Sequence, residues 1–396
     1  MVGATSDYAN LPRDILQELS KFLSFSDYIR FSVVCLHWFE VAKERCHFPQ
    51  KQPYSLIFDA DFQRLFDLSE EKIYQIQMPE LCERHCLGSS YGWLITADLN
   101  LNINLFNPFS KAQVKLPQLP YHVYEIRKKN QLHLLIYKAV ISADPSKSSN
   151  YIVAAHFIPS KLIFWRSSDL TWTVIRIDFF FQDIIWYNGA FYTVGTNRQV
   201  YRVEFGMKNE LIKIASESNV YWHKKNTYMV NFMGDLLLIY RIFYPINYNE
   251  GNNDTDDAVD LDQDNDNNGL RNYYHNDANT RNLFHTRRFM LFKLDQRKNQ
   301  FIEIKSINGH VLFMGENYAV LIPITIRSDK TEDNVIYFSD AHINANGMYR
   351  FSNSRVYSIR DESITPIPLN NIYRHVYHQA KQPMFVDADL SSLILV

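Results

Sequence analysis

Three groups of residues have types and spacings that could support chemistry, and the first is a serine between glycines. Gly88, Ser90 and Gly92 form G-x-S-x-G, the pattern that in hydrolases places a nucleophilic serine on a tight turn between a strand and a helix. The stretch GWLITAD, which begins at Gly92, has the composition of a strand, and no helical pattern follows it. We therefore interpret these glycines as a turn at a sheet edge. A hydrolase that uses Ser90 stays as an alternative function.

The second group consists of residues that bind zinc in other proteins. Cys82, His85 and Cys86 lie close enough in the sequence to share one ion. A structural zinc site needs four ligands in two spaced pairs, and only one such half is present. Cys46 and His47 could complete the set. The sequence favours a loop with ordinary thiols, so we predict no metal site.

The third group lies in an acidic tract, NEGNNDTDDAVDLDQDNDNN, which contains seven Asp and six Asn. The twelfth position of a calcium loop that began at Asp264 should be a bidentate Glu, and it is His275. Acidic tracts of low complexity produce such partial matches freely. We predict a disordered, solvated insert near residues 249–283, without a metal or a cofactor. The partial match to the calcium loop, D-x-D-x-N-G, consists of Asp264, Asp266, Asn268 and Gly269.

The remaining sequence lacks the motifs of the common enzyme classes. It contains no Walker A loop, no G-x-G-x-x-G after a strand, no H-E-x-x-H and no kinase signature. We therefore predict that the chain is not an enzyme. The formal net charge is −2, so no basic field favours binding to nucleic acid or to an anionic membrane.

The N-terminal residues and the most apolar stretch predict where the protein resides. MVGATSDYAN has neither a charged nor an apolar region of the kind found in secretory signals, which predicts an intracellular protein of the cytoplasm or the nucleus. The apolar stretch from Phe232 is interrupted by Asp235 and Arg241 and is too short to span a membrane. Cysteines of intracellular proteins are usually reduced. We expect no disulfide among Cys35, Cys46, Cys82 and Cys86.

Residues 8–48 have the pattern of three short helices. Pro12 fits a first helical turn, because its missing N–H would have no partner there. A unit of about forty residues cannot bury so many apolar side chains in its own interior, so part of them must face another surface. The apolar stripe of the first helix consists of Leu11, Ile15, Leu19 and Phe22, with Leu16 and Leu23 beside it.

From Tyr54 onward the apolar period changes from 3.6 to 2, which is typical of strands. Gly189 and Gly234 lie 45 residues apart in the related stretches YNGAFY and FMGDLLL. Gly315, in FMGENYAVL, follows at a similar spacing once the acidic insert is set aside. A repeat of this length with three or four strands predicts a propeller. The predicted fold is thus mainly β: a small all-α N-terminal unit of three helices, then a large β-propeller of roughly five to seven blades.

The N-terminal stretch LPRDILQELSKFLSFSDYIRFSVVCLHWFEVA resembles an F-box. The resemblance consists of the Leu-Pro start, the apolar stripe, the central Asp27 and the R-F-x-x-V-C-x-x-W run. It departs at Phe39, where many plant members carry Arg after the Trp. The resemblance implies an F-box over residues 8–48, after a flexible N-terminus of residues 1–7.

The rest of the chain resembles the β-propeller domain of a plant family of F-box proteins described as KIB-type. The resemblance implies a propeller over residues 54–396. The C-terminal QPMFVDADLSSLILV is not part of the match, so the closure of the last blade stays open. The matching stretches are FDLSEEKIYQIQMPE, GSSYGWLITAD, INLFNPFSKAQVKLP, KLIFWRSSDLTWTVI and NVIYFSD.

The resemblance implies a substrate receptor of an SCF-type E3 ubiquitin ligase. The F-box would bind a Skp-family adaptor and, through it, the cullin and RING subunits, while the propeller would hold a target protein for ubiquitination and proteasomal degradation. The alternative is a non-degradative scaffold bound to the adaptor. The sequence specifies neither the target nor the residues that bind it, and we expect about half of the adaptor candidates to pack inside the unit. These candidates are Leu11, Pro12, Ile15, Leu16, Leu19, Asp27, Phe31, Val34, Cys35 and Trp38.

Overall fold

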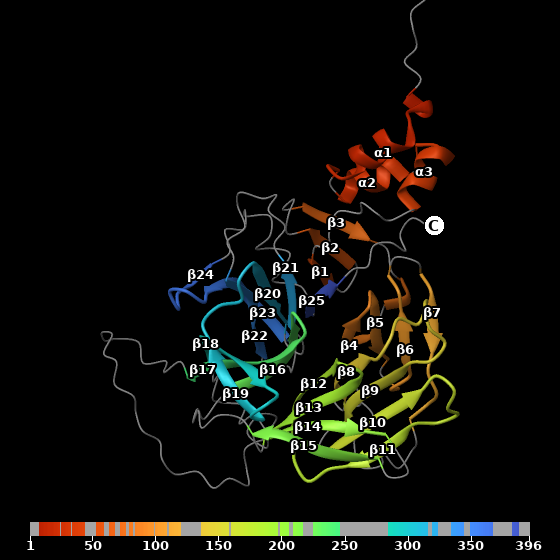
Figure 1. Ribbon diagram of the computed structural model, residues 1–396. Coiled ribbons are helices and arrows are strands. Elements are labelled where there is room, and N and C mark those ends of the chain that lie inside the picture. The colour runs from red at the N-terminus through yellow and green to blue at the C-terminus, as the bar shows by residue number, and fades with distance from the viewer. Residues whose placement is uncertain are drawn as a thin grey trace, which may run out of the picture.

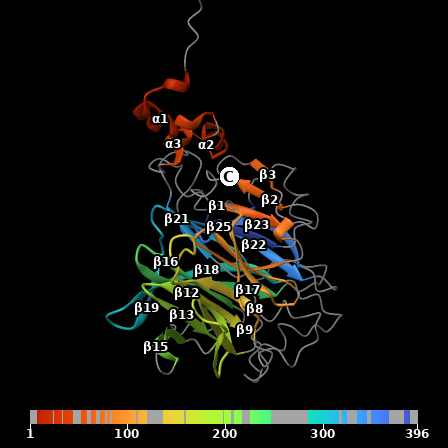
Figure 2. The same ribbon diagram turned by 90° about the vertical axis from the view of Figure 1, so that its right-hand side faces the viewer.

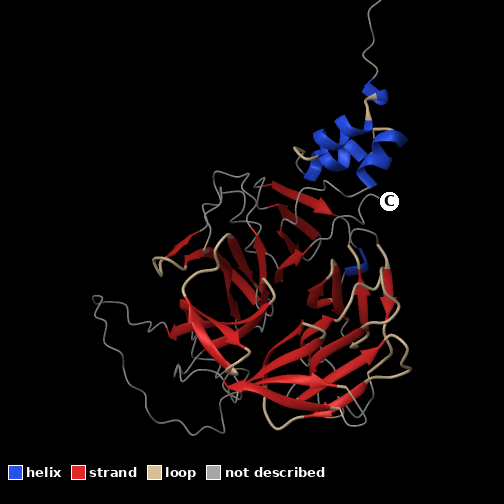
Figure 3. Ribbon diagram, in the orientation of Figure 1, coloured by secondary structure: helices blue, strands red, loops and turns tan. Residues whose placement is uncertain are grey.

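The chain forms an N-terminal helical unit and five β-sheets that lie around a common centre (Figure 1). Helix is confined to the N-terminal unit in the part that the structure describes, apart from the short 3-10 helix η2 (Pro79–Leu81) (Figure 3). The computed structural model describes residues 8–23, 25–32, 34–43, 53–58, 63–67, 72–76, 79–81, 84–98, 100–108, 111–119, 136–157, 160–196, 199–205, 209–216, 225–245, 284–315, 319–323, 334–343, 349–366 and 382–387.

The N-terminal unit consists of three short α-helices, as the sequence predicted. Pro12 lies immediately before the first of them with φ −53° and ψ 144°, a conformation that suits proline because the ring fixes φ near this value. The unit lies outside the ring of sheets, beyond strand β3, in both views (Figures 1 and 2). Its elements are η1 (Tyr8–Asn10), α1 (Arg13–Ser20), α2 (Phe25–Ser32) and α3 (Leu36–Lys43).

Three of the sheets have four strands each. The first contains β25 (Gln382–Asp387), β1 (Pro53–Phe58), β2 (Gln63–Asp67) and β3 (Lys72–Ile76). The second contains β4 (His85–Ser90), β5 (Trp93–Ala97), β6 (Ile103–Phe106) and β7 (Gln113–Lys115). The third contains β8 (Ile136–Ile141), β9 (Ile152–Phe157), β10 (Lys161–Arg166) and β11 (Thr173–Arg176).

The other two sheets are larger. The eight-stranded sheet is built from two consecutive four-stranded repeats. One parallel residue pair, Ser216 with Gln300, joins the two repeats. The first repeat contains β12 (Phe181–Tyr187), β13 (Ala190–Gly195), β14 (Gln199–Glu204) and β15 (Glu210–Ser216). The second contains β16 (Lys225–Phe232), β17 (Asp235–Pro245), β18 (Phe284–Asp295) and β19 (Gln300–Ile304). The five-stranded sheet contains β20 (His310–Met314), β21 (Ala319–Pro323), β22 (Val335–Ile343), β23 (Tyr349–Ser358) and β24 (Ile364–Pro366).

Three repeats begin with the same kind of hairpin, in which two residues connect the first strand to the second. Tyr91 and Gly92 connect β4 to β5, and both have positive φ, 54° and 76°. The pairs Asn188–Gly189 and Met233–Gly234 connect the corresponding strands of the next repeats with the same sign of φ. Two-residue turns of this hand match the twist of antiparallel strands, which is why glycine occupies one position in each.

The middle strands of the propeller repeats are apolar on both faces, because each repeat lies between two neighbours. Strand β17 is the clearest example, since its alternate residues belong to different apolar clusters. This arrangement explains why its sequence reads as a continuous apolar run rather than a strict alternation. Leu236, Leu238, Tyr240 and Ile242 pack toward β12–β15, whereas Leu237 and Ile239 pack toward β20–β24.

The two ends of the propeller sequence meet in one sheet, because β25 pairs with β1 in antiparallel register, with Tyr54 opposite Val386. The closure that the sequence left open is thus made by the strand Gln382–Asp387. The innermost strands are neighbours around the centre of the molecule, in the order β25, β4, β8, β12, β16 and β21.

The structure confirms the predicted fold class, a three-helix N-terminal unit followed by a mainly β propeller. Its five sheets, one of which contains two repeats, agree with the predicted range of five to seven blades. The acidic insert near residues 249–283 lies outside the described residues. Within the described part of the chain, no helix has both the length and the apolar character needed to cross a membrane.

Candidate functional site

The apolar residues of the helical unit divide between an interior and an outer surface. The interior is closed by Tyr28 of α2, whose hydroxyl donates to the carbonyl oxygen of Ala42 in α3 at 2.9 Å. The rings of Phe31 and Trp38 lie against each other with centroids 4.6 Å apart. The buried core consists of Leu16, Tyr28, Phe31, Val41 and Ala42, and Leu11, Leu23, Trp38 and Phe39 pack against it while partly exposed.

Helix α1 carries an apolar stripe that faces solvent. Ile15 and Leu19, one helical turn apart, are 45% and 44% exposed, and Phe22, which follows the helix, is 72% exposed. Leu16 is fully buried, because one residue along an α-helix rotates the side chain by about 100°. Helix α1 therefore places Leu16 in the interior, whereas Ile15, Leu19 and the following Phe22 face the outside. We call these three residues the outer stripe.

Exposed apolar side chains also occur where α2 meets α3. Val34 is 53% exposed and Leu36 is 81% exposed. Exposed apolar groups that gather on a small unit mark a protein-binding surface more often than chance exposure does.

Hydrogen bonds to α3 fix the segment that precedes α1. The indole N–H of Trp38 donates to the carbonyl oxygen of Tyr8 at 3.1 Å. The His37 ring nitrogen Nε2 donates to the carbonyl oxygen of Leu11 at 3.0 Å. These two bonds hold the chain at Leu11 and Pro12 against α3, so the start of α1 has a defined position.

The structure sorts the ten adaptor candidates by exposure, which the sequence could not do. Leu16 and Phe31 belong to the interior, so they support the surface rather than form it. Phe22 and Leu36 were not among the candidates, although the spacing of Phe22 from Ile15 and Leu19 is a helical signal. The exposed candidates are Pro12, Ile15, Leu19, Asp27 and Val34, and the partly buried ones are Leu11, Cys35 and Trp38.

The serine motif of the propeller lies in a hairpin. Ser90 ends β4, and the two-residue turn Tyr91–Gly92 leads directly into β5, so no helix follows the serine. The Ser90 hydroxyl accepts a hydrogen bond from the backbone N–H of Ile141 at 3.5 Å. Gly88 is not part of the turn, as we had interpreted it; it lies inside β4, where a Cβ would overlap the carbonyl oxygen of Ala139. This geometry differs from the strand-to-helix turn of a hydrolase nucleophile.

The cysteine and histidine residues considered above as zinc ligands are only partly covered by the structure, since Cys46, His47 and Cys82 lie outside the described residues. Burial raises the pKa of the Cys86 thiol to about 12, so this sulfur stays protonated and is a poor metal ligand. Cys35 and Cys86, the cysteines in the described part of the chain, are in the thiol form. Nowhere in the described part of the chain do three His, Cys, Asp or Glu side chains gather to hold a metal ion.

A buried ion pair connects the innermost strands of three repeats. Lys138 of β8 forms an ion pair with Asp183 of β12. The two oxygens of the Asp183 carboxylate also accept the N–H groups of Ile184 at 2.7 Å and of Met229 in β16 at 2.6 Å. Burial raises the pKa of Asp183, an effect that Lys138 and the two N–H donors oppose. Both charges are therefore compensated inside the protein, as buried charges must be.

Comparisons with known proteins identify both parts of the chain. The model of the F-box domain matches residues 9–48, and the model of the KIB1-4 beta-propeller matches residues 65–359. The architecture is thus that of an F-box protein with a C-terminal propeller. Because the second match covers more than half of the sequence, the chain belongs to the KIB1-4 beta-propeller family.

Relatives in Arabidopsis thaliana match parts of the chain. A putative F-box protein is 33% identical over 115 residues, which is 28% of this chain and 30% of the relative. F-box only protein 7 is 31% identical over 118 residues, again 28% and 30% of the two chains. An F-box/kelch-repeat protein is 24% identical over 258 residues, 60% of this chain and 68% of the relative. The match thus spans 30% of the length of the first two relatives.

Solved structures with a similar arrangement superpose on this chain only with low TM-scores. The propeller domain of Cps50 (Swd1) from Myceliophteria thermophila aligns with a TM-score of 0.31 and 9% identity, over 82% of this chain and 99% of that one. The N-terminal domain of Nup159 aligns with a TM-score of 0.30 and 8% identity, over 79% and 74% of the two chains. Similarity at this level supports no conclusion about function.

Proposed function

We propose that this chain is the substrate-recognition subunit of an SCF-type ubiquitin ligase. The F-box binds a Skp-family adaptor, the adaptor brings the cullin and RING subunits, and the propeller binds a target protein for ubiquitination and proteasomal degradation. The observation that carries this proposal is the outer stripe of Ile15, Leu19 and Phe22, exposed on an F-box whose interior is already filled.

The adaptor contact surface in this proposal consists of exposed and partly exposed residues. Burial of one fully exposed Leu, Ile or Phe side chain contributes about 1.5 to 3 kcal/mol, before the cost of ordering is subtracted. Leu16 and Phe31 keep the surface in shape from inside. The contacts are Leu11, Pro12, Ile15, Leu19, Asp27, Val34, Cys35 and Trp38, together with Phe22 and Leu36.

The chain itself performs no bond chemistry in this proposal. It places the target near the ubiquitin-conjugating subunit and raises the effective concentration of target lysines there. We assign the adaptor function to residues 8–48 and the target function to residues 54–396.

Complex formation with a purified Skp-type adaptor tests the first half of the proposal. The variant Leu19→Asp places a charge in the outer stripe, and we expect loss of the co-eluting complex in size-exclusion chromatography. Arg13→Asp is the matched control, because Arg13 is exposed and lies on the opposite side of α1. Adaptor binding that survives Leu19→Asp unchanged would contradict the proposed surface.

Proteasome inhibition tests the second half. A target captured in cells by the full chain should accumulate when the proteasome is inhibited, and should not accumulate with Leu19→Asp in place of the wild type. A captured partner whose abundance stays constant under inhibition would instead favour a non-degradative scaffold.

A further inference from the structure

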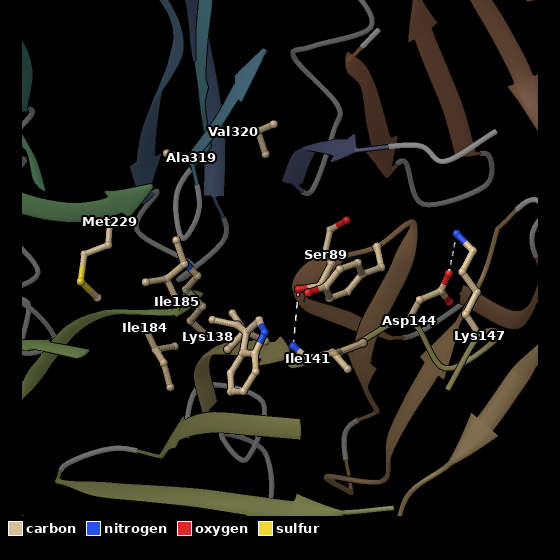
Figure 4. Close-up of a pocket in the computed structure, with 14 residues that line it drawn as sticks. Ser89, Lys138, Ile141, Asp144, Lys147, Ile184, Ile185, Met229, Ala319 and Val320 are labelled. Atoms are coloured by element: carbon tan, nitrogen blue, oxygen red, sulfur yellow. Dashed lines mark hydrogen bonds and ion pairs between the residues drawn. The ribbon is translucent and has the colours of Figure 1, made fainter. Parts of the chain in front are cut away.

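A cavity of about 370 Å³ lies at the centre of the propeller, lined by residues of the innermost strands β4, β8, β12, β16 and β21 (Figure 4). Its mouth is marked by Tyr91, which is 42% exposed, and by Lys147, whose side chain is 59% exposed. Binding sites in proteins are usually cavities of about 300 to 1,000 Å³ with apolar walls and a few placed polar groups. The size suits one or two side chains of a bound segment.

The charged group at the wall of the cavity is an ammonium group. Lys138 lines the cavity although it is only 5% exposed, and its partner Asp183 is 1% exposed. Both oxygens of the Asp183 carboxylate accept backbone N–H groups in addition to the lysine bond. An ammonium group has three N–H bonds, and among the described residues Asp183 is the only acceptor of Lys138. The cavity wall therefore contains a hydrogen-bond donor, the Lys138 ammonium group, whose position is fixed by Asp183.

A second donor comes from β4. The hydroxyl oxygen of Ser89 is buried and has no hydrogen-bond partner among the described residues, and Figure 4 shows its side chain directed into the space between the inner strands. A buried polar atom without a partner costs free energy, and a group of a bound ligand can supply that partner.

The acidic residue at the mouth is already occupied. The Asp144 carboxylate accepts the indole N–H of Trp93 at 3.0 Å, the backbone N–H of Ser146 at 2.9 Å and the ammonium group of Lys147 at 3.2 Å. Burial raises the pKa of Asp144, but these donors and the Ser146 hydroxyl, which also donates to the carboxylate at 2.6 Å, together outweigh burial and hold the pKa below its ordinary value. Asp144 therefore stays ionised and bound to its own neighbours, and it does not provide an acceptor for a basic ligand.

The remaining wall is apolar. Ile184, Ile185 and Trp186 come from consecutive positions of β12, and Met229 and Val320 come from β16 and β21. An occupant must therefore combine a hydrogen-bond acceptor for Lys138 and Ser89 with apolar neighbours.

We propose that this cavity binds an acidic side chain, Asp or Glu, flanked by apolar residues in a segment of the target protein. This inference rests on the proposed function, because it names the part of the target that the propeller recognises. A carboxylate accepts charge-assisted hydrogen bonds from ammonium and hydroxyl groups, and these bonds are about twice as strong as neutral ones.

Binding of two peptide pools to the purified full chain tests this inference. Each pool contains fluorescent hexapeptides with one fixed residue between two apolar residues, and the fixed residue is Glu in one pool and Gln in the other. We expect fluorescence anisotropy to show about tenfold tighter binding of the Glu pool, as one charge-assisted hydrogen bond implies. Equal binding of the pools, tighter binding of the Gln pool, or a solvent-filled channel that binds neither pool would overturn the inference.

Variants of one strand localise the binding. Ser89→Leu fills the cavity and should weaken binding of the Glu pool about tenfold, whereas Ser168→Leu, at an exposed serine between β10 and β11, should change nothing. If Ser89→Leu fails to fold, Ser89→Ala is the second variant, and it should reduce the preference for Glu over Gln. A preference that Ser89→Ala retains in full would place the binding elsewhere and overturn the inference.

The same protein preparation separates this inference from the proposed function. A chain that forms the adaptor complex but does not discriminate the pools contradicts only the cavity assignment. A chain that discriminates the pools but does not bind the adaptor contradicts the ligase proposal.

Discussion

Ile15 and Leu16 are neighbours in α1, yet Ile15 is 45% exposed and Leu16 is fully buried. The boundary between the interior of the F-box and its outer surface therefore passes between two adjacent apolar residues. The two side chains have similar size and hydrophobicity, so exposure alone distinguishes their roles.

Replacement of each residue by alanine should separate binding from stability. We expect Leu16→Ala to lower the free energy of unfolding of the helical unit by about 2 to 5 kcal/mol, because it leaves a cavity in the core. Ile15→Ala should leave stability nearly unchanged and weaken adaptor binding about tenfold. Thermal unfolding and titration with the adaptor measure the two effects. An equal loss of stability in both variants would contradict the two-sided helix.

Tyr28 connects α2 to α3 through the hydrogen bond from its hydroxyl to Ala42. Tyr28→Phe removes the donor and leaves a buried carbonyl oxygen unpaired, so we expect a loss of about 1 to 3 kcal/mol in the stability of the helical unit. Tyr8→Phe is the matched control, since the Tyr8 side chain is 66% exposed. Hydrogen exchange of α3 amides reports the difference, and equal protection in both variants would show that the bond has no role in stability.

The helical period identified the residues of the F-box but not their direction. Leu11, Ile15, Leu16 and Leu19 all have the spacing of an apolar stripe. Which of them faces inward depends on where α2 and α3 place Tyr28 and Val41, and that packing has no signal within α1 itself.

The propeller was predictable where turns and strands are local. The hairpins at Asn188–Gly189 and Met233–Gly234 have turn residues between apolar strands, and both occur in the structure. Strand β4 was missed because Gly88 and two serines have low strand propensity. Strand β25 was missed because it pairs with β1 at the other end of the propeller sequence, and no local pattern indicates such a partner.

The residues of the central cavity were not predicted, although the repeat length contains a signal for them. Lys138 and Asp183 are 45 residues apart, and Asp183 and Met229 are 46 apart, close to the predicted repeat of 45. Equivalent positions on the first strands of successive repeats become neighbours around the centre. Charged residues one repeat apart in otherwise apolar strands are therefore candidates for such a buried pair.

Gly88 and Gly189 are both required by the backbone, for different reasons. A Cβ at Gly88 would overlap the backbone of Ala139 in the neighbouring strand, whereas Gly189 has open space around it and a φ of 78°. We expect Gly88→Ala to lower the free energy of unfolding by about 3 kcal/mol through overpacking. Gly189→Ala should lower it by about 1 kcal/mol through backbone strain. Urea unfolding of the full chain measures both. A smaller loss for Gly88→Ala than for Gly189→Ala would contradict the close approach of β4 and β8.

His156 should make the stability of the propeller dependent on pH. The residue is 1% exposed, and its ring stacks on the ring of Phe181 with the ring centroids 3.9 Å apart. Its Nε2 donates to the Thr193 hydroxyl at 3.0 Å, since that hydroxyl donates its own hydrogen to the backbone carbonyl oxygen of Asp183. Burial, assisted by the charge of Lys138, holds the pKa of His156 well below its ordinary value of 6.5.

The unfolded chain therefore binds a proton near pH 6.5 that the folded chain does not bind, and stability falls as the pH decreases below this value. As the pH is lowered from 6.5 toward the pKa of His156 in the folded state, the free energy of unfolding should fall in both proteins. We expect it to fall by up to about 1.4 kcal/mol per pH unit more in the wild type than in His156→Gln. The other histidines and the Lys138–Asp183 pair are common to both proteins, so the difference between their urea midpoints isolates His156. Parallel pH profiles for the two proteins would show that His156 is protonated in the folded state.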